Sequence, residues 1–437
     1  MKREATRLGH VVGRDASIPR WATRSEPAAE SPAFDSAVVC GNGVGALILA
    51  ARLSRSSSFA GKVVVAAPPV EESRRLVGGL TLRSRALDYY AAALGSTRAQ
   101  LLEMLFPNGA ERAKTTHQMG SVFDPMGDDS NGALRPANPQ VWMSNDAFGG
   151  RALAYGLRNS HLVARLSELA CKLPIDFCEE PVDSLDAAME LAPGSNPLIV
   201  NATIKPLHGT GAEQGGEAPK AIVVASQLPF SAKRRRECGV LGEGASLMAT
   251  VLRDGRNDMG VFNPIIDPLS PTAEYYGIVF RLLATLPGPD KEREQTLVRD
   301  QLLRVAAAVG LDPVDATETE GRALIPCLGW KDLRSLDGRV LELHRLHQAG
   351  YPVITGDGMT KAGLTGLVCA EAILSGNDPV RTANKALRRW RIANYLLSVG
   401  LTSMARMASA AIRRSPRLAL GRGANLPDFW ASIDGVA

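Results

Sequence analysis

The segment SAVVCGNGVGALILAARL, residues 36–53, constrains the fold of this chain more than any other stretch. Residues 37–40 (AVVC) form a short apolar run typical of a buried parallel strand, and residues 46–55 have the Ala- and Leu-rich character of a helix packed on a sheet. A second apolar run, GKVVVAAPP at residues 61–69, follows at the spacing of a βαβ unit. The segment therefore predicts a parallel sheet with a helical crossover.

The turn between the first strand and the helix contains Gly41, Gly43 and Gly45, followed by Ala46. In a dinucleotide-binding loop the first glycine allows a tight turn and the second lets the backbone approach the pyrophosphate. The third position must be small, and Ala46 can serve there. Free N–H groups at the helix start would then bind the phosphates. We expect these four residues to bind a cofactor; the alternative is a purely structural glycine turn.

The acidic residue that normally ends the second strand and binds the ribose hydroxyls is missing from its expected place. That place falls near Ala66 or Ala67. Glu71 and Glu72 follow a little further on and either substitute for it or are solvated loop charges.

Composition limits the class of protein. A chain of 437 residues, 45% apolar and 22% charged, is long enough for two packed domains. The net charge of +5 is small for this length, so nucleic acid is not expected as a partner. The six cysteines have no CxxC spacing, which argues against a disulfide scaffold and favours a cytoplasmic location. No run of eighteen apolar residues predicts a membrane span.

The two ends of the chain differ in composition from the middle. Residues 1–34 lack the apolar core of a secretory signal, and we expect a disordered extension there. Residues 379–437 are predicted to be a helical, basic C-terminal region. Within it, residues 394–414 are interpreted as a packed helix; the alternative is a helix in peripheral contact with a membrane surface.

A second informative segment is YPVITGDGMTKAGLTGLVCAEAIL, residues 351–374, which contains a short strand, a Gly-Asp-Gly turn and a small-residue helix. In these residues the chain resembles the FAD-dependent superfamily typified by p-hydroxybenzoate hydroxylase, which also includes squalene epoxidases, geranylgeranyl reductases and flavin halogenases. The resemblance implies that Asp357 accepts a hydrogen bond from a ribityl hydroxyl and that Gly356 and Gly358 leave room for the cofactor. It also implies a helix start beside the flavin ring, formed by Gly363, Thr365 and Gly366.

Between these segments lies a third region that matches the superfamily in order. Residues 150–177 are predicted to be a helix that leads into a strand, and residues 196–206 a strand that ends in Asn-Ala-Thr. The superfamily has a comparable turn near the FAD adenine, but with glycine where this chain has Ile204. The order of glycine loop, strand, Asn-Ala-Thr turn and Gly-Asp turn is the order that the resemblance requires.

The predicted fold class is α/β, with a doubly wound, Rossmann-like FAD-binding domain over residues 35–378. A mainly antiparallel β-sheet substrate domain is expected as an insertion at about 205–330, and the helical C-terminal tail follows. Strand-like runs rich in β-branched and aromatic residues support the inserted sheet. These runs are residues 221–235, 245–254, 259–268 and 273–286.

Candidate substrate-binding and catalytic residues are few. Four polar residues lie among prolines in residues 260–279 and are either substrate contacts or turn and edge-strand residues: Asn263, Asp267, Tyr275 and Tyr276. His117 and His161 are candidate acid/base groups, although a structural role fits a lone histidine equally well. The catalytic residues therefore stay unknown.

A metal site is not expected. His344 and His347 have a spacing that can place two ligands on one helix face, but no third ligand is in view. We interpret this segment as a solvated helix face.

The residues and the resemblance together predict an FAD-dependent oxidoreductase, a monooxygenase acting on a hydrophobic or aromatic small molecule in secondary metabolism. One alternative, favoured by the Leu-Thr-Gly at residues 364–366, is a flavin-dependent reductase of isoprenoid double bonds. Another is a flavoprotein without catalytic or redox activity. The chain has neither the WxWxIP motif of the halogenases nor a second glycine loop. Electrons would therefore come from transiently bound NAD(P)H or from a separate reductase.

Overall fold

The computed structural model of the chain describes most of residues 34–388. The described residues are 34–59, 61–68, 78–107, 109–123, 136–145, 151–203, 205, 207–210, 221–232, 241–253, 256–268, 270–283, 291–314, 321–327, 340–348 and 358–388. Residues 379–388 are helical, as expected for the start of the C-terminal region. The predictions for residues 1–33 and 394–414 fall outside the described residues. Within the described part, no helix is long and apolar enough to cross a bilayer.

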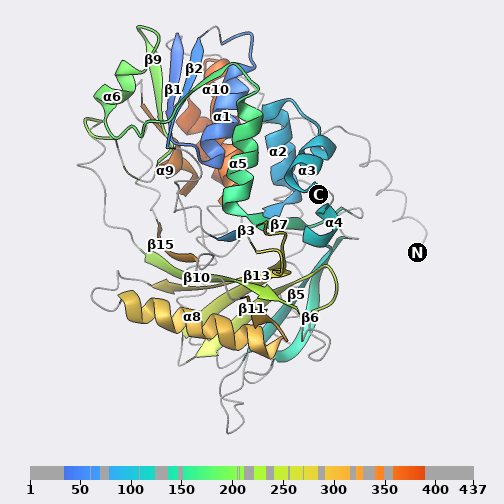
Figure 1. Cartoon of the computed structure of the whole chain (residues 1–437). Coiled ribbons are helices and arrows are strands. Elements are labelled where there is room, and N and C mark those ends of the chain that lie inside the picture. The colour runs from blue at the N-terminus through green and yellow to red at the C-terminus, as the bar shows by residue number, and fades with distance from the viewer. Residues whose placement is uncertain are drawn as a thin grey trace, which may run out of the picture.

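A five-stranded parallel sheet, in the order β16-β9-β1-β2-β8, forms the upper part of the molecule (Figure 1). β1 and β2 pair in parallel from Ser36 opposite Lys62 to Cys40 opposite Ala66, and α1 connects them. The predicted βαβ unit is thereby confirmed. The strands are β1 (Ser36–Cys40), β2 (Lys62–Ala66), β8 (Ile175–Cys178), β9 (Pro197–Asn201) and β16 (Val340–Glu342).

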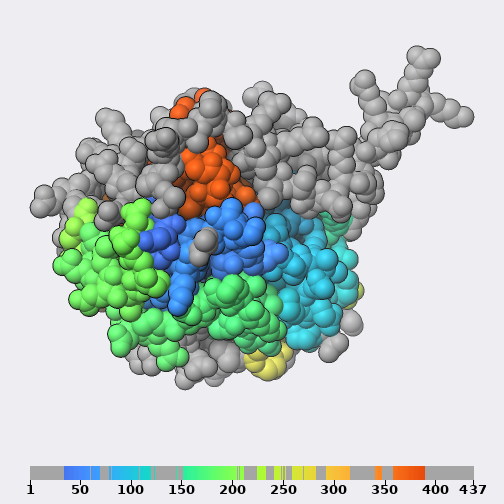
Figure 2. All heavy atoms as spheres, turned by 90° about the horizontal axis from the view of Figure 1, so that it is seen from above, coloured from blue at the N-terminus to red at the C-terminus, as the bar shows by residue number. Residues whose placement is uncertain are grey.

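Helices cover both faces of this sheet because its side chains alternate between two apolar cores. Val39 of β1 faces the core with α1, α2, α5 and α10, whereas Val38 faces the smaller core with α6. Seen from above, β1, α1 and β2 lie between the green residues of the α5-to-β9 region and the orange α10 (Figure 2). The helices are α1 (Val44–Ser54), α2 (Ser84–Leu94), α3 (Arg98–Leu105), α4 (Ala110–Ala113), α5 (Asn159–Ala170), α6 (Leu185–Glu190), α9 (Leu343–Gln348) and α10 (Gly358–Leu374).

An eight-stranded, mainly antiparallel sheet forms the lower part (Figure 1). Its strands are β5 (His117–Phe123), β6 (Pro136–Ser144), β10 (Ala221–Ser231), β11 (Ala245–Arg253), β12 (Arg256–Pro264), β13 (Tyr275–Leu283), β14 (Asp312–Pro313) and β15 (Gly321–Cys327). The four predicted strand runs became β10 to β13. The expected insertion at about 205–330 does not contain the whole sheet. β5 and β6 come before residue 205 in the chain, but β5 pairs with β11 in parallel and β6 pairs with β5.

The eight-stranded sheet has a helix on only one of its faces in the described part of the chain. α8 (Lys291–Ala308) packs beneath the sheet in Figure 1 through Val298, Leu302 and Val305, against Val224 and Phe230 of β10. The opposite face is turned toward the parallel-sheet unit. The antiparallel sheet therefore has one face for its own core and one face for the contact between the two units.

A small sheet of β3 (Gly79–Arg83), β7 (Ala154–Arg158) and β4 (Lys114–Thr115) lies between the two larger sheets (Figure 1). The predicted helix over 150–177 is wrong in its first part, because β7 pairs there with β3 and β4. Gly156 explains the difference: an added Cβ would lie 1.9 Å from the carbonyl oxygen of Pro264, so the backbone of β7 approaches the large sheet directly.

Candidate cofactor-binding site

The site begins where β1 ends, at the point where the order of the parallel sheet reverses. β1 connects to β2 on one side, and β9 lies on the other side of β1, so the crevice outside their carboxyl ends is a topological switch point. Gly41 occupies this crevice with φ +112°, and its N–H donates to Ala66 O at 2.8 Å. An added Cβ would lie 3.3 Å from the carbonyl carbon of Ala202. The backbone thus makes the tight turn that only glycine readily adopts.

Gly43 is the residue that opens the loop toward a ligand. It is the N-cap of α1 with φ −63°, no side-chain hydrogen bond caps the helix, and its first turn has no acidic residue. An added Cβ at Gly43 would have no atom of the described residues within 4 Å. The N–H groups of the first turn of α1 therefore face space that a diphosphate group fits, and the helix dipole favours the negative charge.

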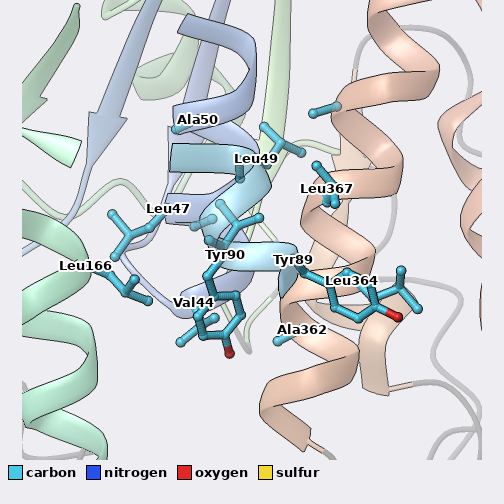
Figure 3. Packing of buried hydrophobic residues seen from close by; sticks show 14 of the residues in the cluster. Val44, Leu47, Leu49, Ala50, Tyr89, Tyr90, Leu166, Ala362, Leu364 and Leu367 are labelled. Carbon is cyan, nitrogen blue, oxygen red and sulfur yellow. The ribbon is translucent and has the colours of Figure 1, made fainter. Parts of the chain in front are cut away.

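A second helix N-terminus lies beside the first. α10 runs alongside α1 in the same direction, with Val44 and Ala362 at the same end of the pair (Figure 3). An added Cβ at Gly45 would lie 3.1 Å from the carbonyl oxygen of Ala362, which fixes this close approach. Gly358, the first residue of α10, likewise has no atom of the described part of the chain within 4 Å of an added Cβ. Two positive helix ends and two open glycines thus lie together.

The expected helix start at Gly363, Thr365 and Gly366 is wrong. α10 is one continuous helix from Gly358, and these residues lie in its interior because no helix breaker separates them from its first turn. An added Cβ at Gly366 would lie 2.4 Å from the carbonyl oxygen of Gly45, and one at Gly363 would overlap the Tyr90 ring.

The structure gives these positions roles in packing between helices. The Thr365 hydroxyl donates to Lys361 O at 2.7 Å within α10. Ala46, on α1, is 1% exposed in the helix-covered core. Gly356 and Asp357 lie outside the described residues, so the predicted ribityl contact stays a prediction.

A buried carboxyl group that the sequence analysis missed lies at the carboxyl end of the parallel sheet. Cys40, Asn201 and Glu342 stand opposite one another on adjacent strands. Asn201 Nδ2 donates to Glu342 Oε2 at 2.9 Å, whereas Oε1 is buried without a hydrogen-bond partner in the described structure. Burial raises the pKa of Glu342, and the charge of Arg345 and the Asn201 hydrogen bond only partly offset this.

Glu342 also affects its neighbour in the row. Burial and the charge of Glu342 raise the pKa of the Cys40 thiol to about 12, so Cys40 is not a nucleophile at neutral pH. The signal in the sequence for this cluster was an acidic residue inside the apolar run Val340–Leu343.

The histidine candidates are positioned by local contacts. His161 Nε2 is hydrogen bonded to Leu105 O at 3.0 Å, and His117 Nδ1 to the Thr116 hydroxyl at 3.0 Å. His344 is not on a solvated helix face: it is half-buried, and burial lowers its pKa to about 4. Among the described residues, no three His, Cys, Asp or Glu side chains are grouped so that they could hold a metal ion.

The face of the large sheet that is turned toward the parallel-sheet unit has a few polar groups on an apolar surface. Tyr276 lies on this face, because an added Cβ at Gly79 would lie 2.4 Å from its ring. Gln227 lies beside it, with Oε1 2.3 Å from an added Cβ at Gly78. Asn263 stands opposite Tyr276 across β12 and β13 and is 8% exposed. Tyr276 and Gln227 pack on this face against Gly79 and Gly78 at the start of β3.

Two of the four predicted substrate-contact candidates make contacts within the protein instead. Tyr275 points to the opposite face, as strand alternation requires, and packs in the core beneath α8. Its hydroxyl donates to Gly242 O at 3.3 Å. Asp267 accepts two hydrogen bonds from Arg158, at 2.7 and 2.5 Å. Tyr276 and Asn263 are the two that lie on the facing surface.

The fold is shared with solved structures of low sequence similarity. FqzB matches at 15% identity and a TM-score of 0.57, covering 94% of this chain and 97% of FqzB. CtdE, in complex with FAD and its substrate 4, matches at 12% identity and a TM-score of 0.51, covering 84% and 89% of the two chains. The 2,6-dihydroxypyridine-3-hydroxylase of Arthrobacter nicotinovorans matches at 11% identity and a TM-score of 0.50, covering 87% and 93%.

No protein-family model matches the chain, and no curated protein matches it in sequence. The similarity therefore lies in the fold, and it extends over nearly the whole length of these structures. The chain therefore shares its fold with these solved structures, which include a hydroxylase and a protein bound to FAD.

Proposed function

We propose that this protein is an FAD-dependent monooxygenase that acts on a hydrophobic or aromatic small molecule. The observation that carries the proposal is the pair of open glycines, Gly43 and Gly358, at two adjacent helix N-termini outside the carboxyl ends of a doubly wound sheet. The shared fold supports it, because solved structures with this fold include a hydroxylase and a protein bound to FAD and a substrate.

FAD, when bound, supplies the redox chemistry with molecular oxygen that a hydroxylation needs. The protein itself has to bind the cofactor, orient the substrate and exclude water from the site. The first-turn N–H groups of α1 would hold the diphosphate, with Gly43 allowing the close approach. On the facing surface of the large sheet, Tyr276, Gln227 and Asn263 would orient a polar edge of the substrate among apolar side chains. NAD(P)H, bound transiently or acting through a separate reductase, is the proposed electron donor.

The first experiment is an absorption spectrum of the purified protein, followed by release and mass identification of its cofactor. Flavin bands at about 370 and 450 nm are expected. Gly43→Ala should weaken FAD binding at least tenfold without loss of stability, because the new methyl group enters the space proposed for the diphosphate and touches no atom of the described residues. Gly242→Ala is the matched control, because an added Cβ there meets only His117 Nε2 at 3.8 Å.

The outcomes separate the proposal from its alternatives. A protein that cannot be reconstituted with FAD is not a flavoenzyme. NAD(P)H oxidation that consumes oxygen supports a monooxygenase, whereas reduction of an isoprenoid double bond without oxygen uptake supports a reductase. If NAD(P)H does not reduce the bound FAD, the protein is either a flavoprotein without redox function or an enzyme that needs a reductase partner. Photoreduction of the bound flavin distinguishes these two cases.

A further inference from the structure

The site as described lacks one contact that a dinucleotide usually receives. A carboxylate at the end of the second strand normally binds the ribose hydroxyls of the adenosine half. β2 ends at Ala66, and Ala67 and Pro68 follow it. Asn42 ties the glycine loop to this place, since its Nδ2 donates to Pro68 O at 3.0 Å. A ligand held at the start of α1 thus lies next to the end of β2, where the described residues supply no acid.

The neighbouring strand supplies one. β8 pairs with β2 in parallel, and Cys178 stands opposite Ala66. The ladder continues one step past the end of β2, because Ala67 N donates to Cys178 O at 2.9 Å. The next residue, Glu179, therefore leaves the sheet at its carboxyl end, one strand away from Ala67. Adjacent strands are about 4.8 Å apart, a distance that a Glu side chain can span.

Glu179 is available for this contact. It is exposed, and it makes no hydrogen bond or ion pair within the described structure. β8 is the edge strand of this sheet in the part of the chain that the structure describes, so no further strand from that part covers this end. On the same strand Phe177 is 39% exposed and is the large hydrophobic side chain most open to solvent among the described residues. An apolar ring and a carboxylate together suit an adenosine, which has a flat base and a ribose diol.

We infer that Glu179 binds the adenosine ribose of the cofactor, so that the ribose-binding carboxylate comes from β8 in place of β2. The inference rests on the proposed function, since it concerns the same FAD. The inference also predicts that removing the Glu179 carboxylate weakens FAD binding, whereas simple charge effects predict the opposite. A carboxylate near a diphosphate repels it, so removing a carboxylate without a ribose contact leaves FAD affinity unchanged or raises it.

The test measures the affinities of FAD and FMN for the apoprotein by flavin fluorescence. Glu179→Gln should weaken FAD binding about tenfold, the loss expected for one hydrogen bond to a charged group, and leave FMN, which has no adenosine, within twofold. Glu180→Gln, the matched control, removes the same charge one residue further along and should leave both affinities within twofold or tighten FAD. Ala67→Asp added to Glu179→Gln should restore FAD affinity, because it returns the carboxylate to β2.

Other results would overturn the inference while leaving the proposed function intact. These are FAD binding that Glu179→Gln leaves unchanged, equal losses for FAD and FMN, or equal losses in Glu179→Gln and Glu180→Gln. A loss confined to the double variant Glu71→Gln, Glu72→Gln would assign the ribose to the loop after β2. Wild-type protein that binds neither flavin would refute the proposed function itself. Thermal melts of the apoproteins establish that each variant is folded.

Discussion

At the scale of single residues, Glu342 is a carboxyl group buried at the end of a parallel strand. It is 4% exposed, one carboxyl oxygen is bonded to Asn201, and the other has no hydrogen-bond partner in the described structure. Folding raises its pKa above 4.5, so the folded state binds the proton more tightly than the unfolded state. Its contribution to stability is therefore full below pH 4.5 and is lost as the pH rises through the folded-state pKa.

Glu342→Gln tests this, because glutamine keeps the acceptor for Asn201 and removes the charge. We expect the variant to be more stable than the wild type at pH 8, with a difference that shrinks to nothing as the pH falls below 4.5. Urea denaturation at a series of pH values measures the difference. The folded-state pKa of His344 is about 4, so this residue lowers the stability of the protein as the pH falls below 6.5. Both proteins contain His344, so its contribution cancels in the difference between them. A pH-independent difference would show that Glu342 has the same pKa in the folded and unfolded states.

At the scale of elements, the contact between α1 and α10 sets the geometry of the site. Gly45 and Gly366 bring the two backbones together, and Tyr90 of α2 packs against Gly363. The Tyr90 hydroxyl donates to Met359 O at 2.9 Å, near the first turn of α10. This packing places the first turn of α1 beside residues 362–366 of α10, so that α10 begins about one turn before this contact.

Gly366→Ala should separate these helices, because its methyl group would lie 2.4 Å from the carbonyl oxygen of Gly45, which is backbone. We expect a loss of about 1–3 kcal/mol in the free energy of unfolding, the range for overpacked cores. Gly358→Ala in the same helix is the control, since its methyl group meets nothing within 4 Å and should leave stability within about 1 kcal/mol. Denaturation of the apoproteins measures both; equal stabilities would mean that the helices adjust without strain.

At the scale of the whole molecule, the two large sheets are joined by close contacts around β3 and β7. Arg158, at the end of β7, forms a two-pronged ion pair with Asp267, which follows β12, and their side chains are 4% and 0% exposed. Removing one partner would leave the other as a buried, uncompensated charge. The orientation of the antiparallel sheet relative to the parallel-sheet unit therefore depends on this pair.

Arg158→Met and Asp267→Leu should each lower the free energy of unfolding by about 3 kcal/mol. The double variant should lose less than the sum of the two, because neither charge is then left alone. The exposed pair Arg165 and Glu168 on α5 is the control, and Arg165→Gln should cost less than about 1 kcal/mol. Strictly additive losses in denaturant unfolding would mean that the two residues stabilise the fold independently.

The sequence by itself determined the features that depend on neighbouring residues. Short apolar strands, a helix and glycines between them lie within residues 36–66, so local pattern was enough to predict the βαβ unit and its tight turn. The strands β10 to β13 were predicted for the same reason. β16 was missed because a strand of three residues, Val340–Glu342, is too short to show a period.

Tertiary structure alone decided the features that join distant residues. Gly363 and Gly366 looked like a helix start, but their partners are Tyr90 and Gly45, more than 250 positions away in the chain. Tyr275 and Tyr276 are adjacent in sequence, and only the pairing of β13 settled which of them faces the parallel-sheet unit. Local patterns report the preferences of the backbone, whereas pairing and close packing depend on which segments meet across the fold.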